Sequence, residues 1–224
     1  MSTLSRGDKG EIKVINVLEK INSFKFIIND FSYINEKTQN SHQIDHIFIH
    51  PHGIFVIETK NYFGEIVGNE GRDLWYKIVK GEKIVIANPI KQNKSHCFLI
   101  KKLLNDKYPV ISVVVYAKNN APYLDNENVI NLSDLTLFIE SYPYEKLISR
   151  KEMEEANDIL VRANVPLSKE EHIQNVKAIK EMKEQFREDM RVAIETRMCP
   201  KCQTKLMVKG YSYSCPACGY KFKL

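Results

Sequence analysis

Three side chains able to do acid, base and metal chemistry lie within residues 43–60, QIDHIFIHPHGIFVIETK. Asp45 interrupts one apolar run, and Glu58 and Lys60 end the next. Two carboxylates held together in an apolar sheet repel each other, and one takes up a proton unless a cation lies between them. Carboxylate oxygens suit Mg²⁺ or Mn²⁺ and leave coordination positions open for water and phosphate. The stretch therefore predicts a divalent-metal site beside an ammonium group, and a purely structural salt bridge is the alternative.

The turn between the two runs decides whether the acids meet. Residues 50–53, HPHG, have Pro and Gly where a type I turn favours them. A two-residue loop places Asp45 directly across from Glu58 and on the face opposite to Ile44. A three-residue loop with a glycine bulge remains open, and it would place His46 across from Glu58. We expect the two-residue loop.

The remaining pattern supplies helices and strands that could position this hairpin. The stretches expected to be extended include a β-branched strand covered on both faces and a glycine-punctuated antiparallel meander. The helices show apolar residues at spacings of three and four, and one opens with an Asn-Pro cap. The expected elements are a helix at 8–22, strands in 24–34, a meander at 62–86, a helix at 88–105, a strand at 110–116, and helices at 133–142 and 144–164.

A long helix is expected over residues 168–196. Pro166 breaks the preceding helix, and residues 168–171, SKEE, have the form of a capping box. Its apolar residues form one stripe on an otherwise charged surface. Such a helix either packs on the rest of the chain or joins two copies in a homodimer, and the sequence leaves both open.

Four cysteines near the C-terminus have the spacing of a metal site. Cys199 and Cys202 form one Cys-x2-Cys pair, and twelve residues separate it from the pair Cys215 and Cys218. Two such pairs bring four thiolates to one tetrahedral Zn²⁺, whose binding supplies folding free energy that so short a segment lacks. Disulfide pairing is the competing interpretation. Cys97 lies alone in an expected helix and is interpreted as a small buried apolar residue.

The charge of the chain is concentrated at this same end. The net charge is +5, yet residues 197–224 carry six basic and no acidic side chains. A local basic excess favours a polyanionic partner such as nucleic acid, with a solubilising tail as the alternative. No signal peptide or membrane-length apolar run is visible, so we expect a cytoplasmic protein without a membrane partner.

Several motifs follow one another in order along the chain: Gly10-Glu11, Gln43-Ile-Asp45-His46, Gly53-Ile-Phe-Val-Ile-Glu58-Thr-Lys60-Asn61, Gly64, Trp75 and Asn88-Pro-Ile-x-Gln92. Together they resemble the NERD (nuclease-related) domain of the PD-(D/E)xK nuclease superfamily. The resemblance covers roughly residues 7–117, with Ile44 in place of the signature proline.

This resemblance implies an α/β fold with a restriction-endonuclease-like mixed sheet flanked by helices, and metal-dependent hydrolysis of DNA. Asp45 and Glu58 would hold Mg²⁺ or Mn²⁺, while Lys60 would orient or help deprotonate the attacking water. The further site residues implied are the carbonyl of Thr59 and the side chain of Glu11 as metal ligands, and Gln43 and Gln92 as polar contacts.

The sequence thus predicts four segments: a nuclease-like domain at 1–120, a helical extension at 121–167, a connecting helix at 168–196 and a four-cysteine zinc ribbon at 197–224. The leading hypothesis is a DNA nuclease whose basic zinc ribbon aids nucleic-acid binding. Two alternatives remain: a catalytically inactive DNA-binding protein that keeps the fold, and a protein-interaction module.

Overall fold

A computed structural model describes residues 5–35, 41–124, 126–210 and 212–223. The chain divides into two compact units, one formed mainly by residues before 168 and the other mainly by residues from 168 onward. The first unit holds the hairpin with Asp45 and Glu58, and the second holds the four paired cysteines.

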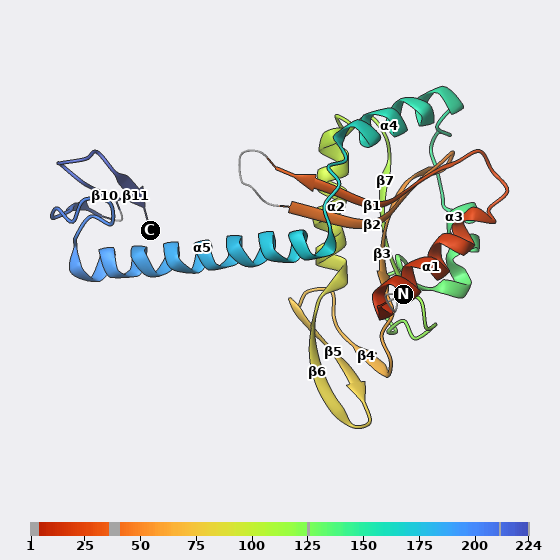
Figure 1. The fold of residues 1–224 in the computed structure, drawn as a ribbon, viewed down its shortest axis with the longest axis horizontal. Coiled ribbons are helices and arrows are strands. Elements are labelled where there is room, and N and C mark those ends of the chain that lie inside the picture. The colour runs from red at the N-terminus through yellow and green to blue at the C-terminus, as the bar shows by residue number, and fades with distance from the viewer. Residues whose placement is uncertain (1–4, 36–40, 125, 211, 224) are drawn as a thin grey trace. The chain divides into compact units, whose positions relative to one another are not determined.

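A five-stranded mixed sheet forms the centre of the first unit (Figure 1). Its order is β1-β2-β3-β7-β8, in which β2 and β3 run antiparallel and β7 runs parallel to both β3 and β8. The expected mixed α/β fold is thereby confirmed. The strands are β1 (Phe26–Ile34), β2 (Ser41–His50), β3 (Gly53–Lys60), β7 (Val110–Tyr116) and β8 (Val129–Asn131).

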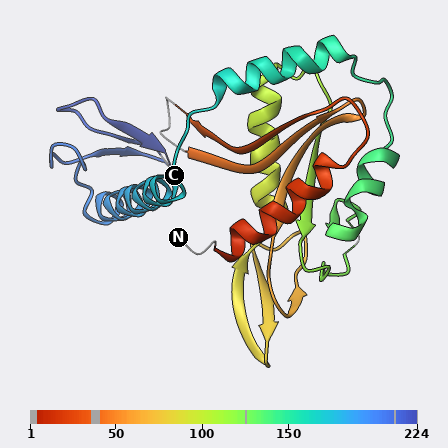
Figure 2. The ribbon, with the colours of Figure 1, turned by 45° about the vertical axis from the view of Figure 1, so that its right-hand side comes forward.

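Helices cover both faces of this sheet. One face buries Ile47, Ile49 and Val56 against α2 (Pro89–Leu103) and α4 (Arg150–Ala163). The other buries Phe48, Phe55 and Ile57 against α1 (Arg6–Glu19) and α3 (Leu135–Ser141), which follows the 3-10 turn η1 (Leu132–Asp134). Figure 2 shows α1 and α2 on opposite sides of the strands. The alternating apolar residues of the hairpin thus pack into two separate hydrophobic cores, one on each face of the sheet.

Local capping chemistry sets most helix boundaries. Asn88 caps α2 by accepting from the backbone N–H groups of Ile90 and Lys91, as the Asn-Pro pair predicts. The fourth helix of the unit begins later than the expected residue 144, because Ser149 and Glu152 form a capping box that starts α4 at Arg150. Strand β8 lies in a stretch expected to be loop, and its pairing with β7 provides the three-residue strand.

The hairpin adopts the two-residue loop, so the three-residue alternative is wrong. His46 pairs with Ile57, Phe48 with Phe55 and His50 with Gly53. Regular pairing ends at His46, however, and Asp45 does not continue the ladder opposite Glu58.

Beyond that point the alternation of side chains slips by one residue. Ile44 packs in the same cluster as Ile47 and Ile49, although strict alternation would place it with Phe48. The ring of His42 likewise meets His96 on α2. An extra residue in one strand of an antiparallel pair has this effect, and such bulges redirect a side chain. The expected position of Ile44 on the opposite face is therefore wrong.

A second sheet in the first unit contains β4 (Glu65–Val67), β5 (Leu74–Val79) and β6 (Glu82–Ala87), and it confirms the expected antiparallel meander. Trp75 is fully buried, as expected of a core residue. A Cβ atom at Gly68 would lie 2.0 Å from the Trp75 ring, so the indole requires glycine there.

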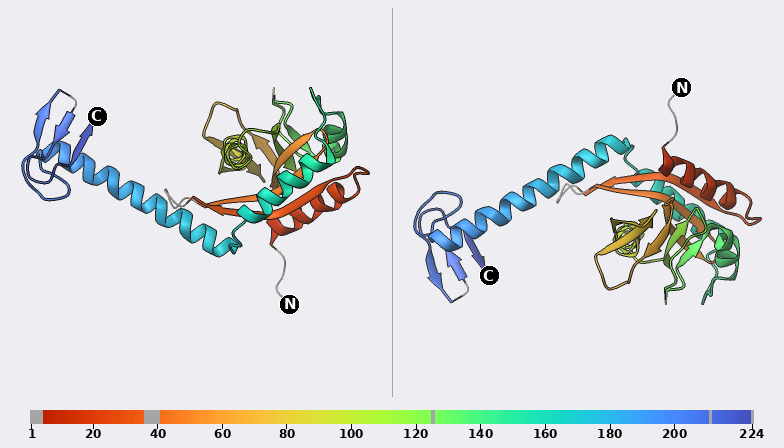
Figure 3. Two further views of the ribbon diagram at one scale, coloured as in Figure 1. Left: turned by 90° about the horizontal axis from the view of Figure 1, so that it is seen from above. Right: turned by 90° about the horizontal axis from the view of Figure 1, so that it is seen from below.

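The second unit combines α5 (Lys169–Thr196) with a small sheet of β9 (Met207–Lys209), β10 (Ser212–Ser214) and β11 (Lys221–Lys223). Figure 3 shows α5 as one uninterrupted helix leading to these strands. The Ser168–Glu171 capping box forms as predicted. A search of the described residues finds no helix with both the length and the apolar character needed to cross a membrane.

Candidate functional site

Glu58 and Lys60 form a buried ion pair at the C-terminal end of β3. The Lys60 Nζ atom lies 2.5 Å from Oε1 of Glu58 and 3.4 Å from Oε1 of Gln92 on α2. Only 4% of the Glu58 side chain and 14% of the Lys60 side chain are exposed. Burial acts to lower the pKa of Lys60, but the Glu58 charge and hydrogen bond outweigh it, so the pKa is raised. Lys60 therefore remains an ammonium at neutral pH.

The second oxygen of Glu58 has no such partner. Oε2 is buried and accepts no hydrogen bond from any described residue. His96 on α2 is an ionisable neighbour of this oxygen, but its Nε2 lies 3.8 Å away, which is too long for a hydrogen bond. An unsatisfied buried carboxylate oxygen is costly in a protein interior. A divalent cation at this oxygen would remove that cost.

Asp45 reaches the same strand end by a different contact. Its Oδ2 accepts a hydrogen bond of 2.7 Å from the backbone N–H of Thr59, between Glu58 and Lys60. Burial, then the negative charge of Glu58, raises the pKa of Asp45 well above its usual range, and the Thr59 bond offsets this only in part. Asp45 is thus close enough to Glu58 for the Glu58 charge to oppose the ionisation of Asp45, as the sequence predicts. A cation shared by Asp45 and Glu58 would remove that opposition.

The remaining predicted site residues differ in how closely they approach Asp45, Glu58 and Lys60. Gln92 contacts Lys60, while Gln43, half-buried in β2, is not a hydrogen-bonding partner of Lys60. The charge of Glu11 on α1 reaches Asp45 and contributes to its raised pKa. Ligand atoms of Glu11, Asp45 and Glu58 nevertheless do not gather within 4.8 Å, since the cysteine set is the one group of three or more that does so in the described chain. Two acids, rather than three, form the core of the site.

Three buried polar residues around this core were missed in the sequence. His96 lies one helical turn after Gln92, so their shared helix face was a usable signal. The amide of Asn93 donates to the backbone carbonyls of Val56 and Val113, which locks α2 onto β3 and β7. Tyr116 pairs with Lys60 across the parallel ladder, and burial raises its pKa.

The four cysteines of the second unit gather at one point. Their sulfur atoms lie within 4.8 Å of one another, with Cys199 3.6 Å from Cys218 and Cys202 3.4 Å from Cys215. A tetrahedral metal with bonds of about 2.3 Å would require separations of about 3.8 Å, so the donor set fits such an ion. Hydrogen bonding with Thr204 lowers the pKa of Cys202 to about 6, which favours the thiolate that a metal needs.

The two Cys-x2-Cys turns have the same backbone construction. In the first, the N–H of Gln203 donates to the carbonyl of Cys199, and in the second, Gly219 donates to Cys215. Both donors have positive φ, +58° for Gln203 and +74° for Gly219. Gln203 and Gly219 therefore hold equivalent positions in the two turns, and only Gly219 is the residue type suited to a positive φ.

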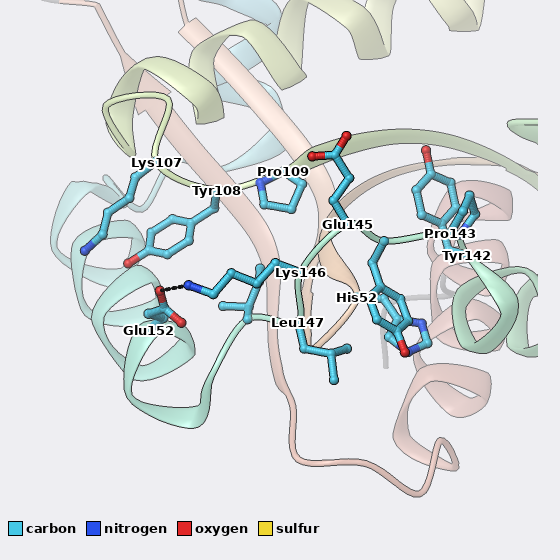
Figure 4. A pocket seen from close by; sticks show the side chains of 12 residues that line it. His52, Lys107, Tyr108, Pro109, Tyr142, Pro143, Glu145, Lys146, Leu147 and Glu152 are labelled. Atoms are coloured by element: carbon cyan, nitrogen blue, oxygen red, sulfur yellow. Dashed lines mark ion pairs between the residues drawn. The ribbon is translucent and has the colours of Figure 1, made fainter.

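A separate cavity of about 340 Å³ lies at the other end of β3, by the hairpin turn (Figure 4). The eight residues of β3 span about 23 Å as a strand, so this cavity is distant from the acids. His52 stacks on Tyr144 with ring centroids 4.5 Å apart. His50 is only 3% exposed although it lies at the hairpin turn, and burial lowers its pKa to about 4.

The mixed sheet, its flanking helices and an Asp/Glu-x-Lys set at a strand end define a nuclease-like α/β domain. The sequence profile of the NERD family, the nuclease-related domain, matches residues 6–117. The chain belongs to the NERD family. An uncharacterized protein of Bacillus anthracis is 30% identical over 165 residues, which cover 71% of this chain and 77% of that protein. No solved structure gives a significant match.

Proposed function

We propose that the protein is a divalent-metal-dependent nuclease that hydrolyses phosphodiester bonds of DNA. The observation that carries this proposal is the buried, unsatisfied Glu58 Oε2 beside Asp45, whose pKa is raised by burial and by Glu58. Ordinary folding gains nothing from placing a buried acid beside a second acid whose charge opposes its ionisation. Family membership agrees with a nuclease-related role.

In this mechanism Asp45 and Glu58 would hold Mg²⁺ or Mn²⁺, and the carbonyl of Thr59 would be a further ligand. A bound ion would supply positive charge at the phosphoryl oxygens and make a water more acidic. Lys60 orients the water whose oxygen attacks phosphorus as the bond to the leaving oxygen breaks, and its charge stabilises the five-coordinate transition state. The attacking water gives up its proton to solvent, and the leaving oxygen takes one up from solvent. Gln92 holds the Lys60 ammonium in place, while Glu11 and Gln43 are proposed to contact outer waters or the DNA strand.

The decisive test compares cleavage of DNA by the wild type and by Asp45→Ala and Lys60→Ala, with Mg²⁺ and with EDTA. Both variants should lose activity, and EDTA should abolish that of the wild type. Lys107→Ala is a matched control, because it removes an exposed ion pair of 2.7 Å with Glu155 far from β3's end. Equal rates of DNA cleavage by the wild type and both site variants would refute the proposal.

A non-catalytic role is the second candidate, favoured by one observation. The Lys60–Glu58 ion pair already neutralises one of the two acids without a metal. A DNA-binding or protein-interaction module could keep this pair for stability alone. Calorimetric titration with Mn²⁺ separates the candidates, because a nuclease centre should bind the ion and lose that binding in Asp45→Asn.

The second unit is proposed to hold structural Zn²⁺ and to bind nucleic acid through its lysines. Tyr213 is buried and stacks on Phe222 at 4.7 Å, and Tyr220 joins the same cluster, so these rings cover the cysteine site rather than present free faces to bases. Tyr211 lies outside the described residues. Binding through lysines alone should weaken steeply with salt. Four reduced thiols also suit the cytoplasm.

Helix α5 supports the proposal of a homodimer. Within the second unit its large apolar side chains remain exposed, including Ile173 at 64%, Met182 at 61% and Phe186 at 56%. One stripe of this kind along a long helix is suited to pairing with a second copy. Light scattering should give twice the mass of one chain for the wild type, and Met182→Glu with Phe186→Glu should give the mass of one chain.

A further inference from the structure

A cleft adjoins the carboxylate site in the first unit. It has a volume of about 370 Å³ and shares Thr59 and Lys60 with the site. Its lining residues are Arg6, Gly7, Thr59, Lys60, Asn61, Tyr62, Phe63 and Lys77. A volume of this size lies within the ~300–1,000 Å³ range of pockets that enclose one small molecule or group.

The walls of this cleft are fixed to the end of β3. The side-chain amide of Asn61 donates to the backbone carbonyl of Arg6 at 2.6 Å, which ties the start of α1 to the chain after β3. A Cβ atom at Gly10 would lie 2.7 Å from Cβ of Asn61, so α1 approaches as closely as it does because residue 10 is glycine. The cleft therefore keeps a defined position next to Lys60.

Three cations in or beside the cleft lie over aromatic rings, unlike Lys60, which is paired with Glu58. The guanidinium of Arg6 is 5.0 Å and the Nζ atom of Lys118 is 4.4 Å from the Phe63 ring centroid. Nζ of Lys77 is 5.2 Å from the ring of Tyr62. None of the three cations forms an ion pair with an acidic residue of the described chain. Unneutralised cations attract phosphate groups, and a base that stacks on Phe63 would take the place of a cation now over its ring.

We propose that this cleft binds an unpaired nucleotide of the DNA strand, next to the phosphodiester held at Asp45, Glu58 and Lys60. This inference rests on the proposed nuclease function and specifies its substrate as single-stranded DNA or a frayed end. Phe63, 48% exposed, stacks on the base, while Arg6, Lys77 and Lys118 hold flanking phosphates.

The form of the cleft argues against a paired duplex as its ligand. Bases of a duplex stack on one another inside the helix, so none can lie flat on the Phe63 ring without being extruded. A single strand presents its bases at no such cost, and stacking on an aromatic ring together with charge neutralisation is the general mode of single-strand binding. The cleft is therefore expected to bind single-stranded DNA in preference to a duplex.

The test measures binding rather than cleavage, in EDTA so that no strand is cut. A fluorescein-labelled oligothymidylate and a blunt hairpin duplex of equal charge are titrated with the full chain. We expect tighter binding of the oligothymidylate, and Phe63→Ala should weaken it about tenfold or more while duplex binding changes little. Phe98→Ala is the matched control, since Phe98 is 61% exposed and has Lys102 4.5 Å from its ring centroid outside the cleft.

Charge is tested in the same way. Lys77→Ala should reduce the slope of log affinity against log salt by about 0.7, the value for one lost single-strand phosphate contact. Lys83→Ala provides the control, because Lys83 lies over Tyr76 at 3.8 Å and does not line the cleft. Equal effects of Phe63→Ala and Phe98→Ala, or preference for the duplex, would overturn the proposal.

This outcome is separable from that of the nuclease assay. Single-strand binding that depends on Phe63 in a protein that never cuts DNA would refute the proposed function but support the cleft as a nucleotide site. Cleavage that depends on Asp45, with binding indifferent to Phe63 and Lys77, would refute the cleft alone.

Discussion

The carboxylate site of the first unit and the thiol cluster of the second place their ligands by different means. Asp45 and Glu58 belong to adjacent strands of a five-stranded sheet with apolar cores on both faces. The cysteines lie on two tight turns beside a cluster in which Ala193, Leu206 and Tyr213 are the buried residues other than cysteine. The sheet would hold its acids in place without any ion, whereas the turns have little else to hold them together.

The two sites also differ in whether the surrounding unit stays folded when no metal is bound. In the first unit Lys60 already compensates Glu58, so the fold survives while the acids retain an electrostatic penalty. In the second unit metal binding and folding are expected to be one event. The first site is therefore suited to exchange ligands and water, and the second to a permanently bound ion.

The largest expected effect is the loss of the second unit on metal removal. Structural zinc contributes roughly 10–16 kcal/mol to small domains, far more than one small apolar cluster. Cys215→Ser should lose bound zinc, measured by elemental analysis, and should expose residues 197–223 to protease while the first unit stays resistant. Cys97→Ala, a buried cysteine outside the cluster, should keep its zinc. If the second unit of the zinc-free protein resisted protease, it would fold without metal, and the two sites would not differ in this respect.

The next effect is catalytic and confined to the first unit. Lys60→Ala should lower the turnover of DNA about 10²–10³-fold, the usual cost of losing one group that stabilises a transition state. Gln92→Ala should cost less, since Gln92 acts through a 3.4 Å contact with Lys60. Single-turnover rates at saturating Mg²⁺ provide the measurement. A larger loss for Gln92→Ala than for Lys60→Ala would contradict the assigned roles.

A stability gain is expected from neutralising Asp45 in the metal-free protein. The pKa of Asp45 is raised in the folded state, so wild-type stability falls as pH rises from the unfolded pKa of about 4 through the folded pKa. The Asp45→Asn variant does not lose stability in this way. Its urea midpoint should therefore be higher than that of the wild type above about pH 4, and the two midpoints should converge in acid. Added Mn²⁺ should stabilise only the wild type.

Asp158→Asn, an exposed change on α4, is the control for this experiment and should show no comparable dependence on pH. A lower urea midpoint for Asp45→Asn than for wild type at pH 7 in EDTA would mean that the Thr59 hydrogen bond outweighs the charge repulsion.

The smallest effect concerns the two turns of the thiol cluster. Gln203→Gly should stabilise the second unit by about 1 kcal/mol, because a side chain at φ +58° is strained by about that amount. Gly219→Ala should destabilise it through backbone strain alone, since no atom lies within 4 Å of the added Cβ. The temperature at which the zinc-bound unit melts is the readout. Equal melting of both variants and wild type would show that the turns are not strained.

Much of this arrangement could be predicted because it depends on short-range chemistry. The HPHG turn determines the pairing of His50 with Gly53. The caps at Asn88 and Ser168 determine where α2 and α5 begin. The Cys-x2-Cys spacing brings each pair of thiols together within a single turn. Each of these features involves residues only a few positions apart, so tertiary packing had little opportunity to change them.

Other features depend on contacts between residues far apart in the chain. The slip that groups Ile44 with Ile47 occurs where pairing with β3 ends. The approach of His96 to Glu58 depends on how α2 packs across β3, and the cleft around Phe63 requires the first turn of α1. Such contacts leave no local pattern.

The sequence by itself determined the ligand types, the hairpin register and the positive end of the chain, because residue chemistry and short spacings are sufficient for these. Only the tertiary structure decided that Asp45 meets the Thr59 N–H, that Gln92 rather than Gln43 contacts Lys60, and that Glu11 stays outside the two-acid core. The physical reason is that packing of helices on a sheet sets side-chain distances to within an ångström, which alternation and periodicity along one chain cannot specify.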